Sequence, residues 1–317
     1  MSLDIHALSV GRLERVIALR GFPGYHDLPP ADVARIAARM GERRYKAGAI
    51  VQKEGKPLTH FHFVIRGEVE IRRGGRLLRR LGARSIVGGT SALAGDPKGY
   101  EIVAVKDTVT LRMAVEDALE VFEEHFEMVQ SVVTRISGEI LGLRRQLAES
   151  GYGFVASTWR PEGAPPAPLD LVGRVAALRE ALPFAGTRME ALVDLARDVE
   201  EVRFEDPIGL WERGHLSDAF YIVRWGAVRG EPEEGAPLRF GPGDVVGSLG
   251  TLSRQPRWYR AITEGVFVAI RVERDTLFDV LEDHFSLARA MIRALAGGML
   301  SLMDRNARVA DATTTAP

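Results

Sequence analysis

The sequence predicts an α+β fold in which two tandem β-barrel (jelly-roll) domains are each flanked by helices and closed by a long C-terminal helix. The chain of 317 residues repeats itself at one offset of 159 residues, without a gap, over more than a hundred residues. Within each copy, short β-branched and aromatic runs alternate with glycines, as strands and turns do. Helical periodicity follows these runs in both copies. Together these observations predict one domain written twice.

The repeat is specific because it keeps one register across elements of different kinds. The segment FHFVIRGEV aligns with FYIVRWGAV, and GARSIVGG aligns with GPGDVVGS. Further pairs in this register are Phe61 with Phe220, Gly67 with Gly226, Gly88 with Gly247, Pro97 with Pro256, and His125-Phe126 with His284-Phe285. A chance match of glycines would not extend over strands and a following helix.

The elements of each copy follow the same order. Apolar residues at helical spacing predict a first helix over 7–19, and VIALR at 16–20 matches VAALR at 175–179. A second helix is expected at ADVARIAARM in the first copy and MEALVDLARDV in the second. Strands separated by glycines are expected from 44 to 111. Long helices then run from 116 to about 149 and from 274 to about 308.

These elements divide the chain into four parts. Residues 1–150 form the first domain with its long helix, and residues 171–308 form the second. Residues 151–170 are rich in Gly and Pro, which predicts a semi-extended linker. Residues 309–317 have nothing to bury and are expected to form a disordered tail.

Composition excludes several classes of function. The net charge is −1, which argues against broad binding to a phosphate backbone, because such binding needs clustered Lys and Arg. The chain has no cysteine, so it has no disulfide, no thiolate nucleophile and no thiolate metal ligand. The N-terminus lacks the apolar core of a signal peptide, and no apolar run approaches the length of a membrane span. We therefore expect a cytoplasmic protein that does not insert into membranes.

Four short elements occur in the same order in both copies. The first copy has Gly48 with Gly55, then FHFVIRGEV, then LGARSIVGG. The second copy has Gly214, FYIVRWGAV and FGPGDVVGS, with Pro207 in place of the first glycine. This pattern resembles the cyclic-nucleotide-binding domain family, which includes catabolite-activator regulators and the regulatory subunits of protein kinase A. The resemblance covers nearly all of both copies and implies the fold described above.

The resemblance also implies where a ligand would bind. The family's phosphate-binding cassette reads G-E-L-A-L and, a few residues later, P-R-A-A-T. In the family, its helical turn presents N–H groups to the cyclic phosphate, the Arg neutralises the phosphate, and the Glu accepts a hydrogen bond from the ribose hydroxyl. The positions that match the Gly, Glu and Arg of the cassette are Gly88, Gly89 and Lys98 in the first copy and Gly247, Ser248 and Arg257 in the second.

Neither copy keeps the carboxylate of the cassette. A charge-assisted hydrogen bond contributes roughly 1.5–3 kcal/mol, so each site is expected to bind a cyclic nucleotide about tenfold to over a hundredfold more weakly than an intact one. Trp258 and Tyr259 in the second copy, and Tyr100 in the first, stand where the family has small residues and would crowd the pocket. Arg257 could hold a phosphate or pair with a surface carboxylate, whereas a structural or solvated role is favoured for Lys98.

The histidines give no sign of a metal site or of catalysis. His60 and His62 alternate on a predicted strand, but no third ligand is suggested by spacing, so a metal site is disfavoured. His125 and His284 share one repeat position and are expected to pack or cap a helix before the long helix. Because no catalytic motif occurs either, we expect a protein that is not an enzyme and binds no metal.

Two functional hypotheses remain open. The first is a regulatory sensor with two degenerate domains that bind a cyclic nucleotide, cAMP or cGMP, or another small anion weakly. The second is a protein-interaction scaffold without nucleotide binding, and an unidentified protein partner is expected in either case. Only a short polar tail follows Arg308, so we expect no helix-turn-helix domain and no specific DNA binding. The apolar stripes of the two long helices predict that these helices pair within one chain as a pseudo-dimer.

Overall fold

The computed structural model describes residues 11–149, 156–181, 188–216 and 218–314. It contains two compact units, which we call unit 1 (Met1–Val132 and Met303–Pro317) and unit 2 (Val133–Leu302). The units differ from the two copies of the repeat, because each long helix is divided between them. The expected domain limits at residues 150 and 171 stay a prediction.

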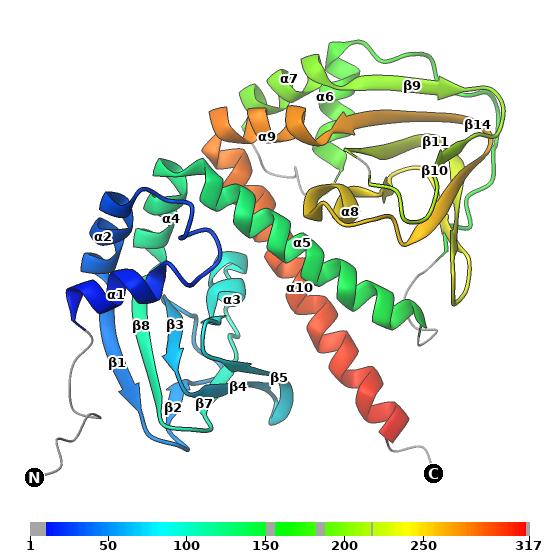
Figure 1. The fold of residues 1–317 in the computed structure, drawn as a ribbon. Coiled ribbons are helices and arrows are strands. Elements are labelled where there is room, and N and C mark those ends of the chain that lie inside the picture. The colour runs from blue at the N-terminus through cyan, green and yellow to red at the C-terminus, as the bar shows by residue number, and fades with distance from the viewer. Residues whose placement is uncertain (1–10, 150–155, 182–187, 217, 315–317) are drawn as a thin grey trace, which may run out of the picture. The chain divides into compact units, whose positions relative to one another are not determined.

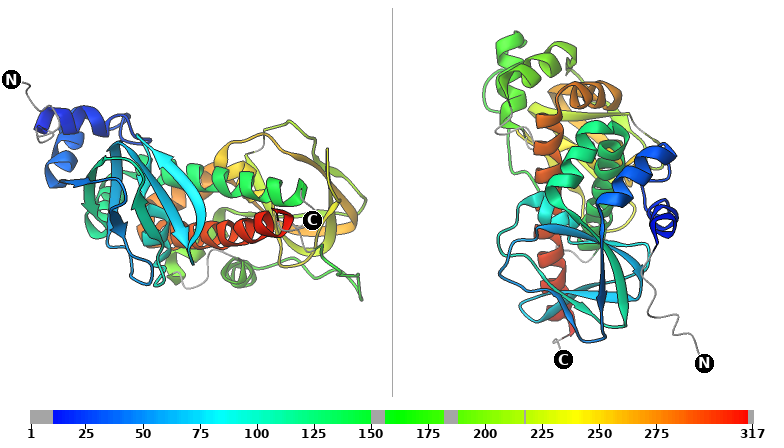
Figure 2. Two further views of the ribbon diagram at one scale, coloured as in Figure 1. Left: turned by 90° about the horizontal axis from the view of Figure 1, so that it is seen from below. Right: turned by 90° about the vertical axis from the view of Figure 1, so that its left-hand side faces the viewer.

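Unit 1 is built on two antiparallel sheets of four strands, with strand orders β1-β8-β3-β6 and β2-β7-β4-β5. Figure 1 shows α1, α2 and α4 at one end of these strands, and the right-hand view in Figure 2 shows the blue α1 and α2 at that end. The elements are α1 (Arg12–Leu19), α2 (Pro30–Arg39), β1 (Gly41–Tyr45), β2 (Ile50–Gln52), β3 (His60–Arg66), β4 (Glu68–Arg73), β5 (Arg76–Gly82), β6 (Ile86–Val87), α3 (Gly89–Ala94), β7 (Glu101–Ala104), β8 (Thr108–Ala114) and α4 (Val115–Glu124).

Unit 2 repeats this order with longer strands. Its six strands form one antiparallel sheet of order β10-β14-β11-β12, in which β13 pairs with β11 and β9 pairs with β14. The elements are α6 (Leu171–Glu180), α7 (Met189–Asp198), β9 (Glu200–Phe204), β10 (Gly209–Trp211), β11 (Ala219–Pro232), β12 (Leu238–Phe240), β13 (Val245–Val246), α8 (Ser248–Ser253), β14 (Tyr259–Glu273) and α9 (Arg274–Asp283). The mixed helix and strand content confirms the predicted α+β class.

The repeat register extends to the burial of side chains. Helices α2 and α7 cover equivalent residues, and both bury the same face. Val33, Ile36 and Ala37 are buried in α2, and Leu192, Leu195 and Ala196 are buried in α7 at positions 159 residues later. An apolar stripe at helical spacing therefore positions the same helix in each copy.

The linker packs against unit 2 where it is described. The ring centroids of Trp159 and Trp225 lie 5.1 Å apart in an edge-to-face arrangement. Arg239 of β12 donates hydrogen bonds to the carbonyls of Ser157 and Trp159 at 2.7 and 2.8 Å. Residues 156–170 lack regular secondary structure, as a Gly/Pro-rich segment should, but these contacts fix part of the segment on the barrel.

The long helices are α5 (Phe126–Glu149) and α10 (Phe285–Thr314). Most residues of the predicted stripes are buried, including Met128, Val132, Ile136 and Ile140 in α5 and Leu287, Met291 and Met299 in α10. Helix α10 continues to Thr314, so the expected tail does not begin at 309; residues 315–317 lie outside the described residues. Pairing of the two helices stays a prediction.

Within the described residues, one helix is long and apolar enough to cross a membrane by length and composition alone. This segment, Phe285–Asn306 of α10, has a mean hydropathy of 1.2, and 39% of it is buried inside the protein. The sequence expectation that no run approaches the length of a span is thus corrected for α10. A single such helix is weak evidence for a membrane, because helices in soluble cores have the same composition.

His62 makes the stability of unit 1 depend on pH. The side chain is 5% exposed on β3, and burial, followed by the charge of Arg112, lowers its pKa from 6.5 to about 4. The unfolded chain therefore binds a proton between these pH values that the folded chain does not bind. We expect the free energy of unfolding to fall by about 2–3 kcal/mol between pH 7 and pH 4.5, and His62→Gln to remove this part of the slope. Urea denaturation of both proteins at pH 7 and pH 4.5 measures the free energies of unfolding. An equal loss of stability in the natural chain and in His62→Gln would contradict this prediction.

Candidate functional site

In each copy the cassette position is a short helix that follows a glycine in the left-handed conformation. Gly88 precedes α3 with φ 84°, and Gly247 precedes α8 with φ 86°. A Cβ on Gly247 would lie 2.6 Å from Nη1 of Arg257 and 2.8 Å from the ring of Trp211. Glycine is required there both by the backbone angle and by the close approach of these side chains.

Arg257 is buried inside the barrel of unit 2 and is only 4% exposed. Its guanidinium donates to the carbonyl of Gly247 at 2.5 Å, to the carbonyl of Ala219 at 2.6 Å and to Oγ1 of Thr251 at 2.9 Å. Its Cζ lies 4.1 Å from the ring centroid of Trp211, a cation–π contact. The sequence left open that Arg257 pairs with a surface carboxylate. Its hydrogen-bond partners in the structure are instead carbonyl and hydroxyl oxygens inside the barrel.

The charge of Arg257 is not balanced by a carboxylate among its described hydrogen-bond partners, which are all carbonyl or hydroxyl oxygens. Its Nε atom is buried and has no hydrogen-bond partner among the described residues. Burial lowers the pKa of the guanidinium, so holding this charge in the barrel costs free energy. Such a group attracts an anion.

A cavity borders Arg257 in unit 2. Ser248, half-buried at the start of α8, lines it, so the structure brings together the three candidate residues of the second copy. Leu141 and Arg144 of α5 line it too, and the remaining lining residues are Phe240, Val245, Gly247, Leu249, Gly250, Pro256, Trp258 and Tyr259. The contribution of α5 was not visible in the sequence, because α5 precedes the second copy.

The cavity is small because aromatic rings fill the space around it. Tyr259 is 6% exposed and stacks on Phe240, with ring centroids 5.9 Å apart, and Trp258 packs edge-on against Tyr259 at 5.1 Å. The volume open to the centre of a water molecule is about 40 Å³. One water needs about 10–15 Å³ on this measure, so the cavity has room for a few waters or a small anion. The predicted crowding by Trp258 and Tyr259 agrees with this geometry.

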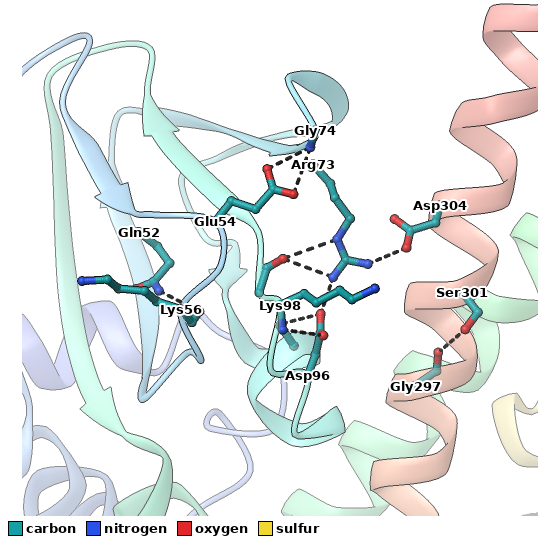
Figure 3. A network of polar contacts seen from close by, with 12 residues as sticks. Gln52, Glu54, Lys56, Arg73, Gly74, Asp96, Lys98, Gly297, Ser301 and Asp304 are labelled. Atoms are coloured by element: carbon teal, nitrogen blue, oxygen red, sulfur yellow. Dashed lines mark hydrogen bonds and ion pairs between the residues drawn. The ribbon is translucent and has the colours of Figure 1, made fainter.

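The first copy places its candidate residues differently. Gly89 is buried in α3, whereas Lys98 is exposed, and its backbone N–H donates to Oδ1 of Asp96 at 3.0 Å. The cation that lies against the cassette is instead Arg73 of β4, whose Cζ is 3.9 Å from the ring centroid of Tyr100. Figure 3 shows Arg73 between Asp96 and Asp304, with the side chain of Lys98 beside it. Sequence reasoning missed Arg73 because the repeat offers no equivalent: Pro232 stands there in the second copy.

The histidines occupy structural positions. His125 and His284 are the C-cap residues of α4 and α9, as expected, and their backbone N–H groups donate to Val121 and Val280. The ring of His284 also binds Asp194 at 2.9 Å. Within the described residues, no group of three His, Cys, Asp or Glu side chains could hold a metal ion.

Comparison with known proteins identifies the family. The sequence profile of the cyclic nucleotide-binding domain matches residues 42–125 and 202–284. No curated protein matches the chain in sequence. Similar solved structures include the regulatory domain of Toxoplasma gondii protein kinase A with cAMP, which is 17% identical over 90% of this chain and 97% of that chain, with a TM-score of 0.33.

Two further structures show the range of similarity. The regulatory subunit of a cAMP-independent protein kinase A from Trypanosoma brucei is 13% identical over 99% of this chain and 95% of that chain, with a TM-score of 0.31. A cyclic nucleotide-binding-like protein from Brucella abortus is 24% identical over 34% of this chain and 97% of that chain, with a TM-score of 0.31. The two profile matches together span more than half of the chain, so the protein belongs to the cyclic nucleotide-binding domain family and carries two tandem copies of that domain.

Proposed function

We propose that the protein is a regulatory sensor without enzymatic activity, and that the second copy holds a weak site for an anion. The single observation that carries this proposal is the buried guanidinium of Arg257 beside the cavity, whose described hydrogen-bond partners include no carboxylate. The ligand is the phosphate group of a cyclic nucleotide, cAMP or cGMP, or another small anion. The first copy offers the exposed Lys98 at the equivalent position and binds more weakly.

The chemistry of the second site favours the phosphate over the rest of a nucleotide. Arg257 supplies the positive charge, and Gly247 lets the backbone approach a ligand closely. Ser248 replaces the carboxylate that would accept a hydrogen bond from the ribose. The rings of Trp258 and Tyr259 must rearrange before a nucleoside can enter. Weak binding with loose selectivity is therefore expected.

A second candidate is a protein-interaction scaffold that binds no nucleotide. The small volume of the cavity favours it, because an ordinary ligand pocket is about 300–1,000 Å³ in size. In either case we propose a cytoplasmic protein whose output is read by a protein partner, without specific recognition of DNA. The net charge of −1 supports the absence of specific DNA recognition, because binding to a phosphate backbone needs clustered Lys and Arg.

Ser248→Glu tests the site by restoring the carboxylate. We expect the variant to bind cAMP about tenfold to a hundredfold more tightly than the natural chain, because a ribose hydroxyl would donate a charge-assisted hydrogen bond to the new side chain. Isothermal titration calorimetry measures the affinity of both proteins.

Ser248→Gln is the matched control, since glutamine has the size of glutamate without its charge. We expect its affinity to remain near that of the natural chain. If neither the natural chain nor Ser248→Glu binds cAMP, cGMP or inorganic phosphate, the scaffold is the correct function.

A further inference from the structure

We propose that Asp304 acts as a built-in anion beside the cassette of the first copy, where Arg73 holds it, and that a soluble anion binds Arg73 only by displacing it. The proposal rests on the proposed function of the second site, because both sites are taken to recognise phosphate-like anions. It adds an anion-binding residue outside the cassette, Arg73, and a carboxylate that blocks it.

Arg73 is the centre of a network within unit 1. Its Nη1 donates to Oδ2 of Asp304 at 2.5 Å, and its Nη2 donates to Oδ2 of Asp96 and, at 3.1 Å, to the carbonyl of Gly99. The ring of Tyr100 lies against its guanidinium. Three segments that are far apart in sequence, namely β4, the end of the cassette and α10, therefore meet at one side chain (Figure 3).

The network is partly shielded from water. The side chains of Arg73 and Asp304 are 20% and 24% exposed, and that of Asp96 is 13% exposed. Asp96 is fixed by the backbone N–H of Lys98 at 3.0 Å and by the hydroxyl of Ser91 at 3.4 Å. Asp96 is thus a fixed part of the cassette, whereas Asp304 is carried by the last helix of the chain.

The equivalent positions of the second copy cannot form this network. Pro232 replaces Arg73, Gln255 replaces Asp96, and Arg145 occupies the position of Asp304 on the long helix. In unit 2 a cavity with room for a small anion lies beside Arg257, whereas in unit 1 Arg73, an arginine at a different repeat position, already binds two carboxylates. The two copies therefore differ: the site in the second copy is open to a soluble anion, whereas the arginine in the first copy is bound by carboxylates of the same chain.

A phosphate oxygen and a carboxylate oxygen make the same kind of charge-assisted hydrogen bond to arginine. An incoming phosphate group therefore competes with Asp304 for Nη1 of Arg73, and it gains the charge of Lys98, whose side chain extends beside the network in Figure 3. Binding releases the end of α10 from the cassette. Because the competition is intramolecular, Arg73 is free of Asp304 in only a fraction of the molecules, and the apparent affinity for the soluble anion falls by that fraction.

The experiment compares calorimetric titrations of cAMP and of inorganic phosphate into the natural chain and into Asp304→Asn. All four tryptophans lie in unit 2, at positions 159, 211, 225 and 258, so tryptophan fluorescence separates the two sites. In the natural chain we expect the blocked first site to bind too weakly to register as a second equivalent. Asp304→Asn is expected to bind there about three- to tenfold more tightly, which adds an equivalent that leaves tryptophan fluorescence unchanged. Arg73→Gln in the Asp304→Asn background is expected to lose this equivalent.

Hydrogen exchange supplies a second readout that needs no ligand. Amides at 300–308 are expected to exchange about three- to tenfold faster in Asp304→Asn than in the natural chain. Glu282→Gln, which removes an exposed carboxylate of α9, is the matched control and is expected to change neither readout. The proposal is overturned if Asp304→Asn exchanges at 300–308 like the natural chain, or if it gains no equivalent for either probe. If only the proposed anion site of the second copy is wrong, the result is different: tryptophan fluorescence then fails to respond to either probe in the natural chain and in every variant.

Discussion

Arg257→Ala is expected to lower the free energy of unfolding of unit 2 by about 2–3 kcal/mol, whereas Lys98→Ala changes that of unit 1 by less than about 0.5 kcal/mol. The two residues occupy the same repeat position, but only Arg257 is buried. Its removal leaves a void beside Trp211 and deletes three hydrogen bonds. The carbonyl of Gly247 also accepts a hydrogen bond from Thr251, and the buried charge itself costs free energy, so the loss stays moderate.

Urea denaturation followed by tryptophan fluorescence measures the first change, because every tryptophan is in unit 2. Circular dichroism measures the unfolding of the Lys98→Ala variant, because unit 1 contains no tryptophan. Equal effects of the two substitutions would mean that the contacts of Arg257 contribute nothing to stability. The loss of stability also means that a ligand-binding defect of Arg257→Ala must be measured at a temperature where the variant remains folded.

Gly226→Ala is expected to destabilise unit 2 by at least about 3 kcal/mol, while Gly214→Ala costs about 1 kcal/mol. The two glycines have nearly the same backbone angle, with φ 84° at Gly226 and φ 81° at Gly214. A Cβ on Gly226 would come closer than 3.0 Å to the carbonyl oxygen of Val266, whereas a Cβ on Gly214 meets nothing within 4 Å. The difference between the variants therefore isolates the steric clash from the cost of the left-handed angle.

Thermal unfolding of the two variants beside the natural chain measures this difference. Gly67 occupies the position of Gly226 in the first copy, and its Cβ would meet the backbone of Asp107 and Thr108. The same result is therefore expected for Gly67→Ala in unit 1. Similar losses for Gly226→Ala and Gly214→Ala would show that the barrel relaxes around the new methyl group.

The repeat made much of the fold predictable. Glycines that need a left-handed backbone recur at the same positions, so the repeat placed Gly88 and Gly247 at the cassette turns where the structure has the starts of α3 and α8. The helices expected from 116 and from 274 are each divided in the structure, at His125 into α4 and α5 and at His284 into α9 and α10. The glycine turns depend on local backbone geometry, which a short sequence pattern determines.

The contacts of the candidate sites were less predictable because they depend on long-range packing. Asp304 binds Arg73 across 231 residues, and no pattern near either residue signals this pair. Arg257 was a candidate from the cassette, but its inward direction is set by Trp211 and by carbonyls of two other elements. Features that only one copy has, such as Arg73, also escape an argument from the repeat.

The most direct test of the anion site in the second copy is a titration of the natural chain with cAMP, read by calorimetry and tryptophan fluorescence together. Trp211 packs on Arg257 and Trp258 lines the cavity, so a ligand at this site must alter their emission. We predict weak binding of one equivalent per chain, with a saturable fluorescence change of the same dissociation constant. Binding of cAMP without any change in tryptophan fluorescence would contradict the account.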